Sequence, residues 1–147
     1  LYLSRSDEPD TVDLADTLIM MGKKVLAPVL TDGHGRSLHE PAWAWYDSKN
    51  VRTGLWQIPE PIAPILPASA IDQVEVVLCS ALFVDRSGYR VGVGGGWYDR
   101  VLAHRADDVP VWAVVNDDEI LDEVPHDPWD ESVTAALTPS GLHMLGQ

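Results

Sequence analysis

Apolar residues in the first 30 positions change from strand-like to helical spacing and back again. Residues 1–4 have the pattern of a strand, and residues 25–30 form a second short apolar run. Between them, apolar residues at i, i+4 and i+7 predict one face of a helix that Asp10 can cap and Gly22 can end. These face residues are Leu14, Leu18 and Met21. Residues 1–30 therefore predict a β-α-β unit with a parallel pair of strands.

The next segment, residues 31–67, is rich in Gly, Pro, Asp and Ser and has no sustained period. A possible hairpin strand lies at residues 43–46, and the rest of the segment predicts an elaborated loop region. Long ordered loops in compact domains often carry function, so this region is a candidate for substrate contacts.

The second half of the chain predicts another β-α-β unit. Residues 74–84 form an apolar run typical of a buried strand, and residues 85–88 have the composition of a turn. Helical spacing over residues 97–104 precedes an apolar strand at residues 111–115, and a last strand is expected near residues 133–137. The two units together predict an α/β fold, with a mainly parallel sheet flanked by helices.

Composition limits the class of protein. The chain has 147 residues, of which 46% are hydrophobic, and this suits one compact domain spanning residues 1–147. A net charge of -13 argues against a nucleic-acid partner, because phosphate binding depends on clustered Lys and Arg. The single cysteine, Cys79, excludes an internal disulfide and fits the cytoplasm. No apolar run is long enough for a membrane span, so no membrane association is expected.

A glycine-rich segment between a predicted strand and a predicted helix is the strongest candidate for chemistry. Its sequence is Arg90-Val91-Gly92-Val93-Gly94-Gly95-Gly96-Trp97-Tyr98-Asp99-Arg100. Backbone N–H groups in such a loop can approach an anion closely, and a helix N-terminus favours negative charge, although a tight turn explains the glycines equally well. No Lys-Ser or Lys-Thr pair follows the glycines, and Trp97 replaces the third glycine of a dinucleotide fingerprint, so neither standard nucleotide motif fits.

That segment resembles the ATP-binding signature of the 5-formyltetrahydrofolate cyclo-ligase family. Other parts of the chain resemble the same family in the same order, over nearly the whole sequence. These parts are the first strand with its Glu-x-x-Thr element (residues 1–11), the second strand (25–28), the Ile-Pro-Glu-Pro loop (56–61), the Phe-Asp-x-x-Gly turn (84–88) and the closing Pro-x-x-x-x-Asp-x-x-Val element (125–133).

The resemblance implies both an activity and a fold. The formyl oxygen of 5-formyltetrahydrofolate would attack the γ-phosphate of ATP, and N10 would then close the activated carbon to give 5,10-methenyltetrahydrofolate, ADP and phosphate. Both substrates are small molecules, and Mg²⁺ would help to position and neutralise the phosphates. The family fold is similar to that of the sugar-phosphate isomerase and CoA-transferase group, and the chain is expected to be a monomer.

The resemblance also assigns residues to ATP and the metal. The expected ATP contacts are Gly92, Val93, Gly94, Gly95, Gly96, Trp97 and Tyr98. Arg90 and Tyr98 are the candidate catalytic residues, although Arg90 could instead brace the loop and Tyr98 could simply pack. Asp99 is the expected magnesium ligand, with Asp130 as a further candidate. An acidic residue in the first turn of a helix can equally be a partner of the helix dipole.

Two residues are assigned to the folate substrate. Glu8 would hydrogen-bond the pterin, and Trp56 would lie against the folate; the alternatives are that Glu8 favours a helix N-terminus and that Trp56 anchors its loop. The histidines lack the spacing of a zinc site. They are His34, His39, His104, His126 and His143. The acidic residues 117–123 are interpreted as a solvated face.

Several positions depart from the family pattern. Trp97 replaces the usual first tyrosine, Val93 stands where a basic residue is frequent, and Thr134 stands where an aspartate is usual. Ser80-Ala81 replaces the usual Pro-Gly or Pro-Ala. The family's first helix, which carries a Lys and an Arg that approach ATP, is expected to be missing from this chain ahead of Leu1. These departures leave open a truncated or degenerate folate- or nucleotide-binding domain without turnover, and an interaction protein that uses exposed tryptophans.

Overall fold

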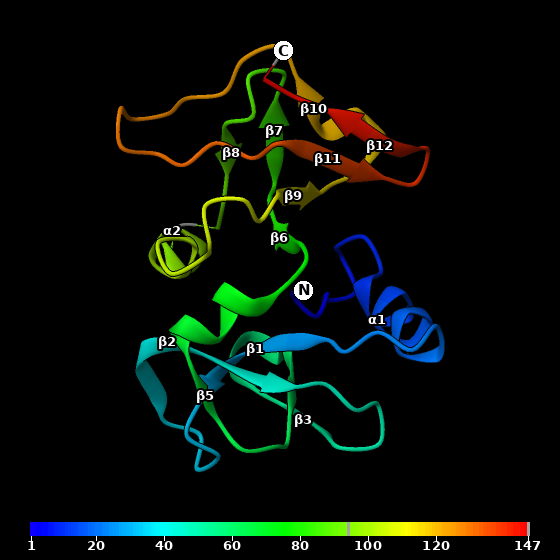
Figure 1. Cartoon of the computed structure of the whole chain (residues 1–147), viewed down its shortest axis with the longest axis vertical. Helices are drawn as coiled ribbons and strands as arrows, with labels where there is room; N and C mark the ends of the chain where they lie inside the picture. The colour runs from blue at the N-terminus through cyan, green and yellow to red at the C-terminus, as the bar shows by residue number, and fades with distance from the viewer. Residues whose placement is uncertain (94, 147) are drawn as a thin grey trace. The chain divides into compact units, whose positions relative to one another are not determined.

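The computed structural model of the chain describes residues 1–93 and 95–146 (Figure 1). The chain divides into two compact units, Leu1–Ala70 and Ile71–Gln147. Each unit has its own sheets: β1-β2-β5 and β3-β4 belong to the first unit, and β12-β11-β9-β6 and β10-β7-β8 belong to the second. The expectation of one domain over residues 1–147 stays a prediction.

The first unit contains the predicted helix, α1 (Thr11–Met20). The Asp10 carboxylate accepts from the N–H groups of Val12 and Asp13, at 3.0 and 3.1 Å, as expected of an N-cap. Gly22 ends the helix in the left-handed region, with φ of 83°. The expected apolar face is wrong at its last position, because Met21 lies after the helix as its C-cap and is 71% exposed.

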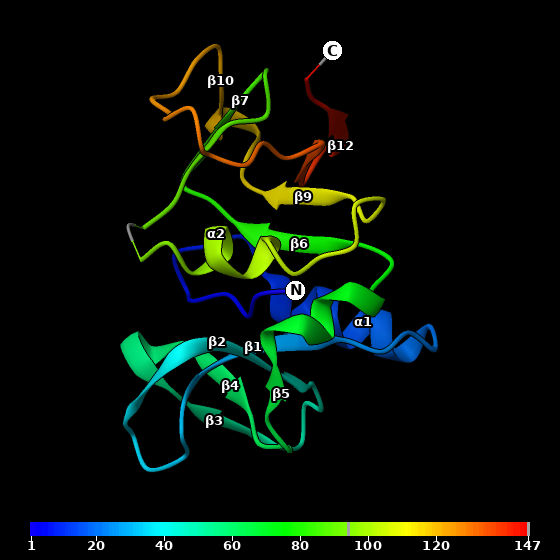
Figure 2. The same cartoon turned by 60° about the vertical axis from the view of Figure 1, so that its left-hand side comes forward.

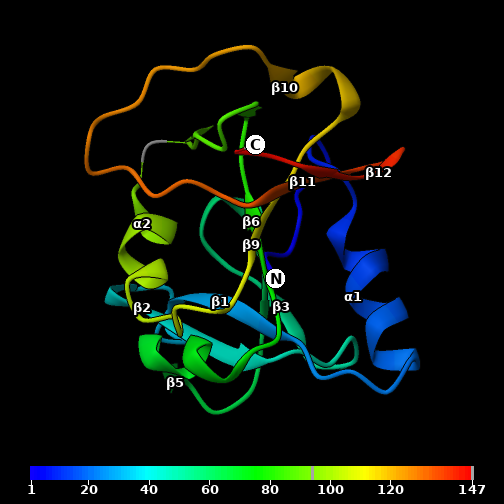
Figure 3. The ribbon, with the colours of Figure 1, turned by 45° about the horizontal axis from the view of Figure 1, so that its top comes forward.

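The strand after α1 pairs with its neighbour in the opposite direction from the prediction. β1 (Leu26–Thr31) is antiparallel to β2 (Ser37–Trp45), which is antiparallel to β5 (Leu66–Pro67), as Figure 3 shows for β1 and β2. Val29, Ala42 and Ala44 form the buried core of this sheet. The β-α-β unit predicted over residues 1–30 is therefore wrong, although its helix and its second strand are confirmed.

Residues 1–4 are buried but form no strand. Their polar backbone groups meet a side chain of α1: the Thr11 hydroxyl donates to the Tyr2 carbonyl at 2.7 Å and accepts from the Ser4 N–H at 2.8 Å. The Ser4 hydroxyl in turn accepts from the Thr11 N–H at 3.0 Å. Because Thr11 satisfies these groups, they are not available for a ladder with a neighbouring strand.

The predicted loop region, residues 31–67, is more regular than its composition indicated. Besides β2 and β5 it holds a second hairpin, in which β3 (Val51–Thr53) is antiparallel to β4 (Pro59–Pro61), as Figure 2 shows. A short turn, η1 (Leu55–Gln57), joins the two strands, and Trp56 within it has non-helical φ and ψ. The possible strand at residues 43–46 forms part of β2, which ends at Trp45. About half of the region forms strands, so the loop prediction is wrong there, because prolines at β-sheet edges do not prevent short strands.

The second unit is built around a four-stranded sheet. β6 (Val77–Ser80), β9 (Val111–Val114) and β11 (Ala135–Thr138) are parallel, and β12 (Gly141–Met144) pairs with β11 in the antiparallel direction. A 3-10 turn, η2 (Ala68–Gln73), precedes β6. Figure 2 shows β6 and β9 side by side with α2 (Trp97–Leu102), which lies between them in sequence. The second β-α-β unit is confirmed.

The apolar run at residues 74–84 does not form one strand. It divides into β6 and β7 (Phe83–Asp85), which belong to different sheets. β7 is antiparallel to β8 (Arg90–Val91) and parallel to β10 (Ile120–Leu121), and a turn at residues 85–88 connects β7 to β8 as predicted. The run is interrupted at Ala81 and Leu82, which belong to neither strand, and both halves contribute buried residues: Leu78 and Cys79 from β6 and Val84 from β7.

The fold class is α/β, as expected, but the sheets are mixed and the helices few. The parallel expectation holds for β6, β9 and β11, and the sheets of the first unit are antiparallel. Within the residues described, no helix has both the length and the apolar character needed to cross a lipid bilayer. The acidic residues 117–123 include a further 3-10 turn, η3 (Asp117–Glu119), and most of them are exposed as expected.

Candidate functional site

The glycine loop follows β8 and leads directly into α2, as the sequence predicted. Its described members Gly92, Val93, Gly95 and Gly96 are all exposed, and Val93 is 73% exposed. Gly94 lies outside the described residues. Gly96 is the N-cap of α2 in the left-handed region, with φ of 62°, and no side chain caps the helix there. The first N–H groups of α2 therefore have no side-chain cap at this residue.

Only some of the glycines in this loop are required by its backbone conformation. A side chain at Gly96 would be strained by its positive φ, whereas a Cβ at Gly95 would meet no atom within 4 Å. A Cβ at Gly92 would lie 3.4 Å from Nη1 of Arg90. The loop is also tied to the helix, because Nη1 of Arg100 donates to the Gly95 carbonyl at 3.0 Å.

Arg90, Tyr98 and Asp99 come together at the start of α2. Nη2 of Arg90 donates to Oδ1 of Asp99 at 2.7 Å, and the guanidinium carbon lies 5.8 Å from the centre of the Tyr98 ring. The Arg90 side chain is only 7% exposed, whereas the Asp99 side chain is 52% exposed. Nε of Arg90 is buried and has no hydrogen-bond partner in the described part of the chain. Arg90 therefore braces the start of α2 through Asp99, and its Nε remains without an acceptor in the described residues.

Tyr98 is buried in the second unit, at 8% exposure. Its hydroxyl lies 3.5 Å from the carbonyl of Leu78 in β6, and its ring meets the Trp97 ring edge-on at 4.9 Å. Trp97 is half-buried beside it. Packing is therefore one function of Tyr98, and the same position places its ring beneath the Arg90 guanidinium.

The two carboxylates expected to hold a metal are in different local settings. Asp99 keeps its second oxygen, Oδ2, outside the bond to Arg90. Asp130 is half-buried and closes a local turn, because its Oδ2 accepts from the Asp127 N–H at 2.7 Å. In residues 1–93 and 95–146, no group of three or more His, Cys, Asp or Glu side chains could by itself hold a metal ion. Such a group is not required by Mg²⁺, which takes one or two carboxylates together with phosphate oxygens and water.

The two residues expected to bind folate lie in the first unit. Glu8 is half-buried, and its Oε2 accepts from the Arg5 N–H at 2.7 Å, so the carboxylate closes a turn before α1 and keeps Oε1 outside that bond. Trp56 is 70% exposed and has φ of 53° and ψ of 29°. Exposure of the ring argues against the alternative that Trp56 anchors its loop by packing.

Two buried carboxylates were missed by the sequence analysis. Glu60 is 1% exposed and accepts from Nη2 and Nε of Arg52 at 2.7 and 3.1 Å, and from the Leu30 N–H at 2.9 Å. Asp85 is 1% exposed and accepts from the N–H groups of Ser87, Tyr89 and Val124 at 2.9, 3.0 and 3.0 Å. The sequence predicted the turn at residues 85–88, but an aspartate at the start of a turn does not by itself indicate that its carboxylate is buried.

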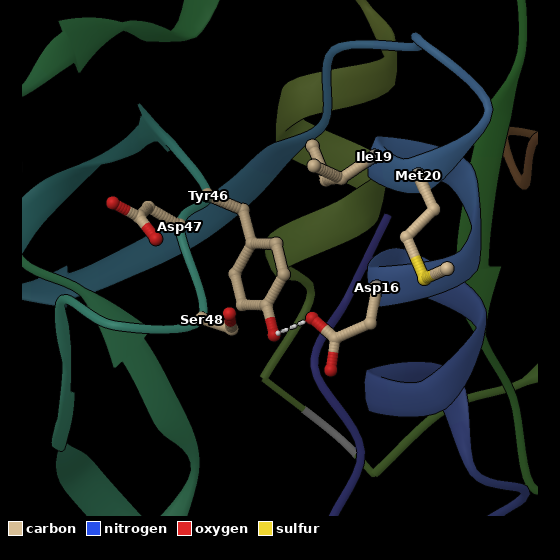
Figure 4. A pocket seen from close by; sticks show the side chains of 6 residues that line it. All are labelled: Asp16, Ile19, Met20, Tyr46, Asp47 and Ser48. Atoms are coloured by element: carbon tan, nitrogen blue, oxygen red, sulfur yellow. Dashed lines mark hydrogen bonds between the residues drawn. The ribbon is translucent and has the colours of Figure 1, made fainter.

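A cavity of about 350 Å³ lies in the first unit, between α1 and the end of β2 (Figure 4). Its lining consists of Asp16, Ile19, Met20, Tyr46, Asp47 and Ser48. The Tyr46 hydroxyl donates to Asp16 at 2.7 Å, as the dashed line in Figure 4 marks, and burial together with that carboxylate raises the pKa of Tyr46. None of the residues assigned from the sequence lines this cavity.

The family model and similar relatives all point to one protein family. The model of the 5-formyltetrahydrofolate cyclo-ligase family matches residues 1–139. A 5-formyltetrahydrofolate cyclo-ligase of Mycolicibacterium smegmatis is 41% identical over 138 residues, which cover 94% of this chain and 71% of the relative. An enzyme of the same name from Escherichia coli strain K12 is 31% identical over 144 residues, with 95% and 76% covered.

Solved structures are similar over 92–99% of the chain. The NMR structure of Aquifex aeolicus 5,10-methenyltetrahydrofolate synthetase gives a TM-score of 0.76 at 21% identity and covers 99% of this chain and 70% of the other. The 5,10-methenyltetrahydrofolate synthetase of Mycoplasma pneumoniae gives 0.64 at 17% identity, with 92% and 69% covered. At these identities the structures support the fold alone.

Proposed function

Because the chain belongs to the 5-formyltetrahydrofolate cyclo-ligase family, we propose that it catalyses the ATP-dependent conversion of 5-formyltetrahydrofolate to 5,10-methenyltetrahydrofolate, with release of ADP and phosphate. The observation that carries the proposal is the cluster of Arg90, Tyr98 and Asp99 beside an exposed glycine loop, within the region that matches the family. The non-catalytic alternative is less favoured, since the relatives are named as enzymes.

The glycine loop is proposed to hold the ATP phosphates. Its exposed backbone at Gly92, Gly95 and Gly96 can approach an anion without side chains in the way, and Val93 adds only its backbone N–H. The other proposed ATP contacts are Gly94, Trp97 and Tyr98. The left-handed Gly96 turns the chain into α2, so the first amides of the helix follow the loop directly.

Arg90 is the proposed source of positive charge at the reacting phosphate. Its guanidinium is nearly buried and fixed at one end by Asp99, so it is held without reorganisation when negative charge develops. Tyr98 supports the guanidinium from below through its ring.

Mg²⁺ is proposed to accompany ATP, because this ion takes one or two carboxylates together with phosphate oxygens and water. Asp99 would hold the ion through Oδ2, and Asp130 is the further candidate. When bound, the ion would neutralise phosphate charge. Asp99 would then serve both the ion and Arg90, which fixes its carboxylate before ATP arrives.

The folate side of the reaction is proposed to use the first unit. Glu8 would accept hydrogen bonds from the pterin through its free oxygen, and Trp56 would offer its exposed ring to a flat part of the substrate. We also propose that residues 1–147 form one domain, with a fold similar to that of the sugar-phosphate isomerase and CoA-transferase group. The protein is further proposed to be a cytoplasmic monomer.

Turnover is tested by mixing the chain with 5-formyltetrahydrofolate, ATP and Mg²⁺ and following the absorbance of the methenyl product together with ADP release. We expect both signals to require all three components and to disappear in Asp99→Ala. Saturable binding of either substrate by folded protein without any product would reject catalysis and favour the binding-domain alternative.

A further inference from the structure

The loop that carries Trp56 adopts a conformation that its residues do not favour. Trp56 and Gln57 both have positive φ, at 53° and 62°, and they are the non-glycine residues with positive φ in the described parts of the chain. The Ile58 N–H donates to the Leu55 carbonyl at 3.0 Å, which closes a four-residue turn with the left-handed pattern of type I′. Such turns favour Asn and Gly, because other L-residues are strained there.

Nothing in the described residues shows that packing of the Trp56 ring offsets this strain. The ring is 70% exposed, whereas Trp43 of the same unit is 1% exposed. Strained backbone persists where the surrounding structure fixes it, and it concentrates at sites of function. The exposed ring on a strained turn therefore needs an anchor that holds it.

Glu60 supplies that anchor from the strand after the turn. It pairs with Arg52 across the β3–β4 hairpin, where Thr53 and Pro59 form the last pair before the turn. Its carboxylate also accepts from the Leu30 N–H and from the Thr31 hydroxyl, so it ties the hairpin to the end of β1. The charge of a buried carboxylate is balanced here by the Arg52 guanidinium.

The turn is packed closely against this anchor. The Gly54 N–H donates to the Ile58 carbonyl at 2.8 Å, and a Cβ at Gly54 would lie only 2.9 Å from Oε2 of Glu60. The Gly54 backbone at the base of the turn therefore lies against the Glu60 carboxylate, with no room for a side chain between them. We expect a shift of Glu60 to change the position from which Leu55 and Trp56 leave the hairpin.

We infer that Glu60, through Arg52, is a positioning residue that holds the Trp56–Gln57 turn strained, so that the Trp56 ring is a rigid face for a conjugated ring of the substrate. This inference rests on the proposed function for the identity of the ligand. The claim that a buried ion pair keeps the turn strained can be tested on this chain without any ligand.

The first test exchanges the turn for an unstrained one. In the double variant Trp56→Asn with Gln57→Gly, the urea midpoint of unfolding rises, while the dissociation constant for 5-formyltetrahydrofolate rises about tenfold or more and that for ATP stays unchanged. Trp45→Thr removes a half-exposed tryptophan from β2 as the matched control and leaves both dissociation constants unchanged. A lower urea midpoint in the double variant, or unchanged folate affinity, overturns the inference.

The second test asks whether Glu60 acts through the turn. Glu60→Gln keeps the shape but loses the charge, and it weakens folate binding while ATP binding stays unchanged. Adding Gln57→Gly to Glu60→Gln restores folate affinity, because glycine adopts the left-handed conformation without being held. Equal loss of ATP and folate binding, or absence of rescue, would show a merely structural role.

Failure of the proposed function and failure of the positioning inference give different results. If the unaltered chain does not bind 5-formyltetrahydrofolate, the proposed function fails for this chain, and the urea midpoints still decide whether the turn is strained. If the unaltered chain binds and turns over but the double variant does so equally well, the positioning inference fails and the proposed function stands.

Discussion

The Arg90 guanidinium and the Asp99 carboxylate form a 2.7 Å ion pair across the glycine loop, with the arginine nearly buried and the aspartate half exposed. β8 therefore begins with a cation whose position is set by the first turn of the following helix. In the proposed site, Asp99 would combine two roles, holding Arg90 and binding Mg²⁺.

We expect Asp99→Asn to lower kcat/KM for ATP about 100-fold or more, because the variant weakens both the hold on Arg90 and the affinity for Mg²⁺. Steady-state rates at a series of Mg²⁺ concentrations measure both effects, and partial recovery at high Mg²⁺ is expected from a metal ligand. Asp108→Asn, at an exposed position of the same unit, is the control. Wild-type kinetics in Asp99→Asn would instead leave the aspartate as a helix-dipole partner.

Gly88→Ala should destabilise the protein by about 2–4 kcal/mol. Gly88 has φ of 95°, and a Cβ there would overlap the Val133 carbonyl oxygen, so backbone would have to move. Urea denaturation measures the change. Gly35→Ala is the matched control, since Gly35 has φ of 81° but open space, and strain alone should cost it about 1–2 kcal/mol. Equal losses in the two variants would argue against the contact with Val133.

Removing the Asp85 carboxylate should cost about 2–4 kcal/mol, because Asp85→Ala leaves three backbone N–H groups without their acceptor. Asp85→Asn keeps one oxygen acceptor and should lose less. The midpoint and slope of urea unfolding check both variants. Asp122→Ala provides the comparison, because its side chain is 95% exposed and its ion pair with Arg86 should contribute about 0–1 kcal/mol. A loss in Asp85→Ala no greater than in Asp122→Ala would contradict the prediction.

Stability at alkaline pH should depend on Cys79. Burial raises the pKa of this thiol to about 11 from an ordinary value of 9.0. Between these values the unfolded chain loses the proton and the folded chain keeps it, so stability present below pH 9.0 declines as pH rises toward 11. The free energy of unfolding should fall by about 2–3 kcal/mol in total, at about 1.36 kcal/mol per pKa unit.

The measurement is the difference in free energy of unfolding between the unaltered chain and Cys79→Ala from pH 8 to 11. Other groups titrate in the same range in both proteins, so the difference isolates the thiol. A difference independent of pH would show that the thiol ionises as readily in the folded protein as in the unfolded chain.

Local elements were predictable from the sequence because their signals are local. Asp10 and Gly22 mark both ends of α1, and the glycine loop before Trp97 marks the start of α2. The direction of pairing carries no such signal, since apolar periodicity within β1 is the same whether its neighbour is parallel or antiparallel. The strand at residues 1–4 failed for another reason, because the Thr11 side chain took the hydrogen bonds that a strand needs.

The candidate site was predictable where its residues are adjacent in sequence. Arg90, Tyr98 and Asp99 lie within ten positions, and the structure brings them together. Glu60 was hidden because a glutamate between two prolines reads as an exposed loop residue, and its burial depends on Arg52, a strand partner eight positions earlier. Pairing across strands, rather than composition, creates that buried ion pair.

The bonds between Thr11 and the segment at residues 2–4 also determine how the start of the chain exchanges hydrogen with solvent. The Ser4 amide proton is held by a helix side chain, and the Thr11 amide proton is held by the Ser4 hydroxyl. Neither proton can exchange until the first turn of α1 separates from the extended segment. These two amides, seven positions apart, should therefore exchange together as one opening unit, at a rate independent of how fast the β-sheets fray.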